Sequence, residues 1–258
     1  MAAWMGVVEG ITEYLPISST GHLILANEWM GKPFSDVFEV VIQSGAVLAV
    51  LVEYWKRFAR LADFRNLVGF AGIRGLFWLG LTTLPAVVLG GLFHSVIKEK
   101  LFTPGVIAIA LGVGGVIMIV MERLLPSQEE GGVDALGWKR ALGMGFFQCL
   151  AMVPGTSRSM ATIMGGRLMG LGRKTAAEYS FFAAVPVLML AAVYDLYKGW
   201  DSLQHSDYIP YAIGLGVSYV VARLAIRWLM KLISNHTFEA FGWYRMGLSL
   251  VVWWWLVY

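Results

Sequence analysis

The stretch EGITEYLPISSTGH, from Glu9 to His22, places ionisable side chains and hydroxyl groups inside a long apolar region of the chain. Glu9 and Glu13 are four residues apart, so a helix would carry both carboxylates on one face. Pro16 ends or kinks such a helix, because proline has no N–H and its ring clashes with the preceding turn. The stretch therefore predicts a broken helix with polar groups gathered at the break.

Three hydroxyl residues and a histidine follow the proline. Ser18, Ser19 and Thr20 form a run that favours the start of a helix over its interior, and capping alone explains Ser18 and Thr20. A helix beginning near Ser18 would place Ser19 beside His22, three residues further along. A histidine in that place can carry a proton near neutral pH. Ser19 can then act either as a nucleophile or as a hydrogen-bond donor to phosphate, and the sequence does not separate these roles.

Composition indicates an integral membrane protein. The 258 residues are 58% hydrophobic and only 14% charged, and the mean hydropathy is +0.66, whereas a soluble domain carries roughly 25% charged residues. The single Cys149 excludes an internal disulfide. Glycine is abundant, and Gly6 and Gly10 have the spacing of closely packed membrane helices. No stripe of interleaved basic and aromatic residues suggests nucleic acid as a partner.

Eight apolar segments follow one another along the chain, and a span needs about 20 mostly apolar residues. Six segments meet that requirement: 37–55, 75–93, 104–122, 178–197, 210–230 and 240–258. Two others, 2–26 and 141–170, are interrupted by proline and polar residues, and each is predicted to form a re-entrant pair of short helices. Irregular backbone at membrane depth is stable only where protein buries it or where it lines a wet cavity.

The order of these segments repeats in the two halves of the chain. Residues 1–124 and 138–258 each contain one re-entrant pair and three spans, so the halves must have opposite orientations. The predicted fold is an all-α polytopic membrane protein, a single integral membrane domain over residues 1–258 with six transmembrane helices and two re-entrant helix-loop-helix segments in an inverted-topology repeat. Broken helices that meet near the midplane of such a repeat usually mark a substrate site.

Basic residues are distributed unevenly between the two predicted sides of the membrane. Fourteen Lys and Arg residues lie in four segments of one side: 56–74, 123–140, 167–175 and 223–234. Four lie in the segments of the other side: Lys32, Lys98, Lys100 and Lys198. Because cytoplasmic loops carry the excess of Lys and Arg, the first re-entrant pair is expected to open to the outer side.

The second break has the sequence PGTSRSMAT, residues 154–162. Its hydroxyl residues are Thr156, Ser157, Ser159 and Thr162. Gly155 helps to turn the chain before a new helix, whose N-terminal N–H groups favour an anion. Arg158 suits a two-pronged grip on phosphate oxygens. Alternatively Arg158 neutralises Glu9 or Glu13, and both statements can hold if a diphosphate lies between them.

The two glutamates need a compensating partner in the membrane. A charged side chain at the centre of the bilayer costs roughly 2.5–3.5 kcal/mol on insertion scales, and two like charges one turn apart repel each other. A cation, a shared proton or an arginine would meet that need. Hard carboxylate oxygens suit Mg²⁺ or Ca²⁺, and Mg²⁺ is often held by one or two carboxylates together with substrate phosphate.

Both motifs, EGITEYLPISSTGH and PGTSRSMAT, closely resemble the two signature motifs of the undecaprenyl-diphosphate phosphatase family, the bacitracin-resistance type. The resemblance covers nearly the whole chain, including FEVVIQSGAVLAV and PAVVLGGLFH. It implies a hydrolase of the bacterial plasma (inner) membrane that depends on a divalent metal. Such an enzyme removes the terminal phosphate of undecaprenyl diphosphate, which recycles the lipid carrier for peptidoglycan synthesis, and its overproduction confers bacitracin resistance.

The resemblance also implies roles for single residues. Glu9 and Glu13 match the acidic motif that handles metal and catalysis. Ser19 and His22 match the proposed nucleophile and its proton partner, and Arg158 matches the phosphate-binding arginine. The predicted substrate contacts are Ser18, Thr20, Gly155, Thr156, Ser157, Arg158, Ser159 and Thr162.

A transporter is the main alternative, because inverted repeats with broken helices also build carriers. A polyprenyl-phosphate flippase would need the arginine and the hydroxyl groups but not a carboxylate pair beside a Ser–His pair, which favours the enzyme. A purely structural subunit is disfavoured, because ionisable groups at membrane depth are costly. The expected partners are the diphosphate lipid and membrane lipids, and the sequence leaves monomer and homodimer both open.

Overall fold

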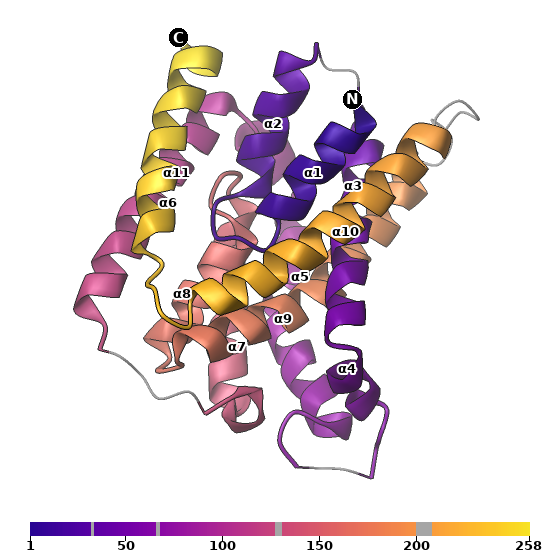
Figure 1. Ribbon diagram of the computed structural model, residues 1–258, viewed down its shortest axis with the longest axis vertical. Coiled ribbons are helices and arrows are strands. Elements are labelled where there is room, and N and C mark those ends of the chain that lie inside the picture. Colours follow the sequence, from indigo (N-terminus) through magenta and orange to yellow (C-terminus); the bar gives the residue numbers. More distant parts are fainter. Residues whose placement is uncertain (32–33, 66–67, 127–130, 200–207) are drawn as a thin grey trace.

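The computed structural model describes residues 1–31, 34–65, 68–126, 131–199 and 208–258, and within these ranges every regular element is a helix (Figure 1). The first half contains α1 (Ala2–Thr12), α2 (Ser19–Trp29), α3 (Asp36–Glu53), α4 (Trp55–Leu61), α5 (Gly72–Lys100) and α6 (Pro104–Leu124). The second half contains the 3₁₀ turns η1 (Val133–Ala135) and η2 (Cys149–Met152), the helices α7 (Trp138–Gln148), α8 (Arg158–Leu168), α9 (Arg173–Gly199), α10 (Tyr208–Leu232) and α11 (Glu239–Val252), and the π-helical turn η5 (Trp253–Val257).

Four helices are long and apolar enough to cross a membrane, namely α5, α6, α9 and α10. A fifth is added if α3 and α4, which meet at a bend of 81°, form one span. Helix α11 has only 14 residues before the π-helical turn and falls short of the required length. The chain is thus a multi-pass helical membrane protein with four or five candidate spans, a coarser result than the six predicted segments, although each of those coincides with a helix.

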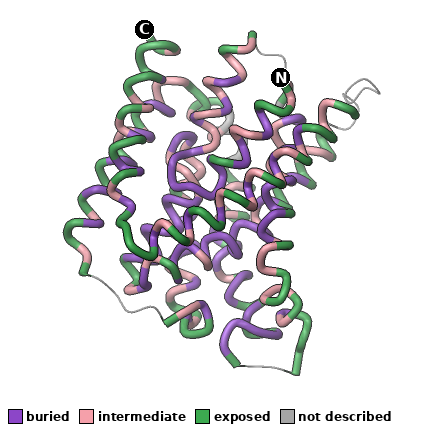
Figure 2. Tube along the Cα trace, in the orientation of Figure 1, coloured by how far each residue is buried: buried purple, intermediate pink, exposed green. Residues whose placement is uncertain are grey.

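The outward faces of the long helices are apolar. Buried residues run through the middle of the molecule, and exposed residues line its flanks (Figure 2). Large exposed side chains include Phe77 on α5, Ile109 on α6 and Leu224 on α10. A soluble monomer rarely exposes so much apolar surface, so these faces fit a lipid environment.

The basic segment that includes α4 lies at the end of the molecule opposite both chain termini (Figure 1). Helix α4 carries Lys56, Arg57 and Arg60. Four lysines were predicted for the side of the membrane with few basic residues. Of these, Lys32 and the side chain of Lys98 lie outside the described residues. This arrangement separates α4 from the two chain termini along the long axis.

Helix α1 lies directly against α10 because two of its residues have no side chain. A Cβ atom on Gly6 would lie 2.5 Å from the carbonyl oxygen of Gly214, and one on Gly10 would lie 2.8 Å from that of Ser218. Both distances are too short for real contacts, so the predicted close packing at Gly6 and Gly10 is confirmed.

We predict that Gly10→Ala lowers the free energy of unfolding by about 1–3 kcal/mol, the usual cost of overpacking an interior. Thermal unfolding of the detergent-solubilised protein measures it. Gly80→Ala on α5 is the matched control, because a Cβ there has no neighbour within 4 Å. Equal stability of the two variants would contradict the close contact of α1 with α10.

Candidate functional site

The two breaks are built alike. Ser18 precedes α2 with a φ of +74°, and Ser157 precedes α8 with a φ of +73°. They are the two non-glycine residues in the described part of the chain with positive φ, a conformation that costs an ordinary side chain about 1–3 kcal/mol. Each hydroxyl accepts a hydrogen bond from the N–H three residues on, at 3.3 Å from Gly21 and 3.2 Å from Met160. Both serines therefore cap the helix that follows, as predicted for Ser18.

A buried ion pair joins the first break to the second. Glu13 directly follows α1, and Arg158 is the first residue of α8. Arg158 Nη2 donates to Glu13 Oε1 at 2.9 Å, and the two side chains are only 9% and 4% exposed. The Ser19 hydroxyl donates to the other carboxylate oxygen, Oε2, at 2.7 Å. The predicted pairing of Arg158 with one of the two glutamates is confirmed for Glu13, and Ser19 belongs to the same cluster.

Helix α9 binds the second terminal nitrogen of Arg158, Nη1. Arg158 Nη1 donates to the carbonyl oxygen of Ser180 at 3.0 Å and lies 3.3 Å from its hydroxyl. The Thr162 hydroxyl lies 2.6 Å from that of Ser180, and the guanidinium stands over the Tyr14 ring at 5.6 Å. Neither Ser180 nor Tyr14 was predicted. Tyr14 lies inside the first motif, which is a signal that could have found it, whereas only the packing of α9 against α8 brings Ser180 here.

The remaining hydroxyls of the second break hold backbone. Ser159 Oγ donates to the carbonyl oxygen of Leu15 at 2.8 Å and lies 3.0 Å from Ser157 Oγ. The Thr162 hydroxyl also lies 2.8 Å from the carbonyl oxygen of Arg158. These bonds tie the two breaks together and orient the start of α8. Thr20 and Thr156 are partly exposed beside the breaks, and their predicted contact with substrate stays a prediction.

Gly155 is required by its surroundings. Its φ is +91°, and a Cβ there would lie 2.5 Å from the carbonyl oxygen of Ile107 on α6. Any other residue would be strained in this conformation and would push α6 away. The predicted turn at Gly155 therefore depends on a close backbone approach.

Glu9 is the unpaired acid of the site. It is fully buried, and neither of its carboxylate oxygens has a hydrogen-bond partner among the described residues. An ionised carboxylate buried without a partner costs several kcal/mol, so this position calls for a proton or a cation. Among the described residues, no group of three or more His, Cys, Asp or Glu side chains could hold a metal by itself.

His22 is held from two sides, and neither partner is Ser19. Its Nδ1 lies 2.7 Å from the carbonyl oxygen of Ser18, and its Nε2 lies 2.7 Å from the Tyr244 hydroxyl on α11. The two rings are stacked with an interplanar angle of 3°. A carbonyl oxygen can only accept, so Nδ1 carries the hydrogen and Nε2 accepts from Tyr244. Within the described residues, no hydrogen bond joins Ser19 to His22, although the predicted three-residue spacing on α2 is present.

The family model described as "Bacitracin resistance protein BacA" matches residues 2–251. The chain belongs to the BacA family. Similar curated proteins include one from Nitratidesulfovibrio vulgaris, 48% identical over 100% of this chain and 98% of its own length. Others come from Aromatoleum aromaticum, 48% identical over 98% and 92%, and from Bordetella petrii, 42% identical over 99% and 96%. All three are named undecaprenyl-diphosphatase.

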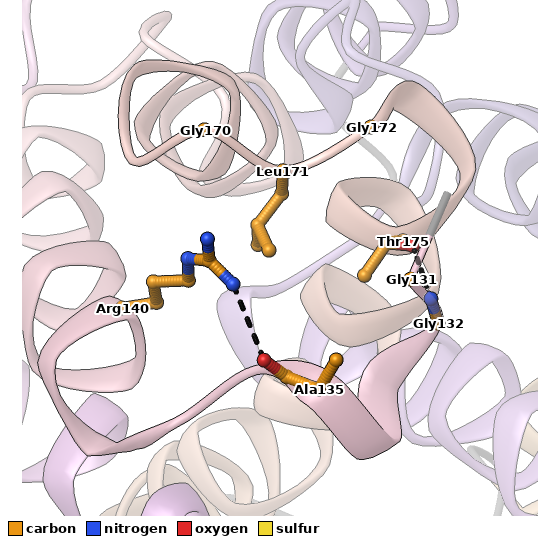
Figure 3. Close-up of a pocket in the computed structure, with 8 residues that line it drawn as sticks. All are labelled: Gly131, Gly132, Ala135, Arg140, Gly170, Leu171, Gly172 and Thr175. Atoms are coloured by element: carbon orange, nitrogen blue, oxygen red, sulfur yellow. Dashed lines mark hydrogen bonds between the residues drawn. The ribbon is translucent and has the colours of Figure 1, made fainter. Parts of the chain in front are cut away.

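Two cavities of this BacA-family chain are lined by residues other than the ion pair and Ser19, and one of them reaches Thr156 and Met160 on either side of Arg158. One is an apolar groove of about 400 Å³ between α6, α7 and α8, lined by residues such as Val113, Met160 and Met164. The other, of about 370 Å³, is lined by four glycines and by Arg140, which donates to the Ala135 carbonyl oxygen at 3.2 Å (Figure 3). Neither cavity is lined by Glu13, Ser19 or Arg158. We therefore locate the candidate site by the contacts among these side chains and not by cavity volume.

We predict that the ring of His22 is protonated at Nδ1 in the neutral state, since Ser18 offers only an acceptor. Nitrogen-15 chemical shifts of the ring measure this directly. In Tyr244→Phe, the Nε2 resonance should shift while the Nδ1–H group persists, and Tyr258→Phe at the 98% exposed terminal residue is the control. A ring protonated at Nε2 would contradict the assignment.

Proposed function

We propose that this protein is an undecaprenyl-diphosphatase, a membrane hydrolase that converts undecaprenyl diphosphate into undecaprenyl phosphate and inorganic phosphate. The observation that carries the proposal is the buried Glu13–Arg158–Ser19 cluster, which joins two polar breaks in an apolar chain. Full-length relatives with this name support the same substrate. The product returns as lipid carrier to peptidoglycan synthesis, and more of the enzyme would raise resistance to bacitracin.

Arg158 is the phosphate-binding group in this proposal. Its buried Nε has no hydrogen-bond partner in the part of the chain that the structure describes, and the N-terminus of α8 adds partial positive charge at the same place. A phosphate that approaches Arg158 would take over part of its bond with Glu13 and release one carboxylate oxygen. Forked N–H donors that are already in place stabilise charge on a phosphoryl group without reorganisation.

Ser19 is the proposed nucleophile and Glu13 its proton acceptor. The Ser19 hydroxyl already donates to Glu13 Oε2 at 2.7 Å, within the reach expected of a general base. Its oxygen forms a bond to the terminal phosphorus in line with the bridging oxygen, whose bond breaks, and undecaprenyl phosphate leaves. A water oxygen then forms a bond to the phosphorus of the phosphoserine while the bond from phosphorus to Ser19 Oγ breaks. The proton on Glu13 returns to Oγ, and the protons of the water leave with the inorganic phosphate.

His22 has a positioning part in this scheme. Its Nδ1–H group holds the carbonyl oxygen of Ser18, the strained residue directly before Ser19. Fixing that turn aims the Ser19 hydroxyl at Glu13. We therefore expect His22→Ala to lower turnover more than it weakens substrate binding.

We also propose a divalent metal, Mg²⁺ or Ca²⁺, as cofactor. The unpaired and buried carboxylate oxygens of Glu9, four residues before Glu13, fit a hard cation. Glu9 and Glu13 would hold the ion, and phosphate oxygens and water would complete its coordination. When bound, such an ion neutralises negative charge on the diphosphate.

The finer topology is part of the proposal: six spans, two re-entrant pairs and an inverted repeat of residues 1–124 and 138–258. Exchange of the halves relates α1 to α7, α2 to α8, α3 to α9, α5 to α10 and α6 to α11. Under that exchange the contact of α1 with α10 becomes that of α7 with α5, and the contact of α3 with α10 becomes that of α9 with α5. The pairs α3–α9 and α6–α11 map onto themselves. This pattern supports a two-fold axis between the breaks.

Orientation follows from the basic loops. We propose that α4 faces the cytoplasm and that the site opens to the periplasmic side of the inner membrane. A reporter fused after Tyr258 is then expected to give a periplasmic signal, and one inserted after Ala62 a cytoplasmic signal. The reverse pair of signals would contradict the orientation and leave the site geometry untouched.

We predict that the purified protein releases phosphate from undecaprenyl diphosphate when Mg²⁺ or Ca²⁺ is present, and that a chelator stops it. Glu13→Gln should reduce turnover by about 10²–10⁴-fold, the usual contribution of a general base, and Ser19→Ala should do the same if the phosphoserine forms. Ser234→Ala is the control, since Ser234 is exposed and its hydroxyl donates to the Met230 carbonyl oxygen within its own helix turn.

Two outcomes would contradict this scheme in different ways. A Ser19→Ala protein with most of its activity would exclude the covalent step and leave water as the attacking group. A folded wild-type protein that binds the lipid and releases no phosphate would exclude the phosphatase.

A further inference from the structure

Arg245 on α11 is fully buried and contacts both breaks. Its Nη1 donates to the carbonyl oxygen of Pro16 at 3.3 Å. Its Nη2 donates to the carbonyl oxygen of Gly155 at 2.9 Å and to that of Ala110 on α6 at 3.1 Å. One guanidinium thus connects three segments that are far apart in the sequence. Two of them are the turns that carry the catalytic groups.

Within the described residues, Arg245 has no carboxylate partner, and its Nε has no hydrogen-bond partner at all. Its charge is balanced by carbonyl dipoles alone, an arrangement that is costly in a buried place. Space for the guanidinium comes from Gly114 on α6, because a Cβ there would overlap Nη2 of Arg245. The fold thus sets aside room for a buried cation that forms no ion pair.

We propose that Arg245 is a positioning residue that holds the two breaks in register, so that Glu13 of one meets Arg158 of the other. Pro16 is three residues from both Glu13 and Ser19, and Gly155 is three residues from Arg158. The positions of these two carbonyl groups therefore set where the reacting groups lie. The inference rests on the proposed function only for the kinetic part of its test.

Helices α6 and α11 also contact each other at positions other than this arginine. Helices α6 and α11 meet at Gly115 and Gly242, where a Cβ on either residue would lie within 3 Å of the other's carbonyl oxygen. The Ser249 hydroxyl also donates to the carbonyl oxygen of Ala108 at 2.6 Å. The pair is thus held along its length by contacts other than Arg245, whose guanidinium extends beyond them to the breaks.

Lysine cannot copy the arrangement, because three carbonyl oxygens are bound by two different nitrogens of a planar fork. Arg245→Lys keeps the positive charge, but the two breaks are no longer held in position relative to each other. We expect it to lower kcat for phosphate release by about 10- to 100-fold, the range that small misplacements of reacting groups produce, with KM changed less than about threefold.

Gly114→Ala tests the same contact from α6. The added methyl group displaces the guanidinium, while the residue at position 245 is still an arginine. This variant should lower kcat in the same way. Gly105→Ala, also on α6, is the matched control, since a Cβ there has no neighbour within 4 Å. In an Arg158→Ala background, Arg245→Lys should add little further loss, because it acts through the contact that is already gone.

Hydrogen exchange provides a readout that needs no activity. In Arg245→Lys and Gly114→Ala, amides of residues 13–19 and 154–158 should exchange faster together, while those of α10 keep the wild-type rate. Unchanged exchange at both breaks, wild-type kcat in Arg245→Lys, or a loss that is fully additive with Arg158→Ala would overturn the proposal. If the wild-type protein released no phosphate, the exchange data would still show whether Arg245 holds the two breaks together.

Discussion

The buried ion pair between Glu13 and Arg158 constrains how the two broken helices can be arranged. Its two side chains come from different halves of the chain and meet almost fully buried. Removal of one partner of such a pair leaves an uncompensated buried charge and costs about 3–5 kcal/mol. The fold must therefore hold two interrupted helices within hydrogen-bond distance of each other. Most of the polar contacts around the site serve that requirement.

Three further interactions keep the breaks together. Ser159 bonds to the backbone of the first break, Arg245 bonds to both breaks, and Gly155 allows α6 to approach the second. Each uses backbone carbonyl groups or bare backbone, which a broken helix supplies in excess. Interrupting a helix in an apolar environment thus creates the acceptors that hold the interruption in place.

The hydroxyl groups at the two breaks have different kinds of hydrogen-bond partner. Ser18 and Ser157 cap helices, and Ser159 and Thr162 bond to backbone and to neighbouring hydroxyl groups. Ser19 is different, because it donates to an ionisable group, the carboxylate of Glu13. Glu9 lies buried, and among the described residues its carboxylate has no hydrogen-bond partner. The hydroxyl that contacts an ionisable group is thus distinct from those that hold the backbone.

The membrane class, the two polar breaks and the ranges of the main helices could be predicted from the sequence, because apolar run length, proline position and helix capping act over a few neighbouring residues. Glu13 and Arg158 could be predicted too, since ionisable groups in an apolar stretch are costly and therefore conspicuous, and Ser19 follows the proline of the first break. The contact of His22 with Tyr244 and the contacts of Ser180 and Arg245 with the breaks could not be predicted in this way. A side chain bonds to whichever partners helix packing brings close, and those partners lie up to 229 residues away in the chain.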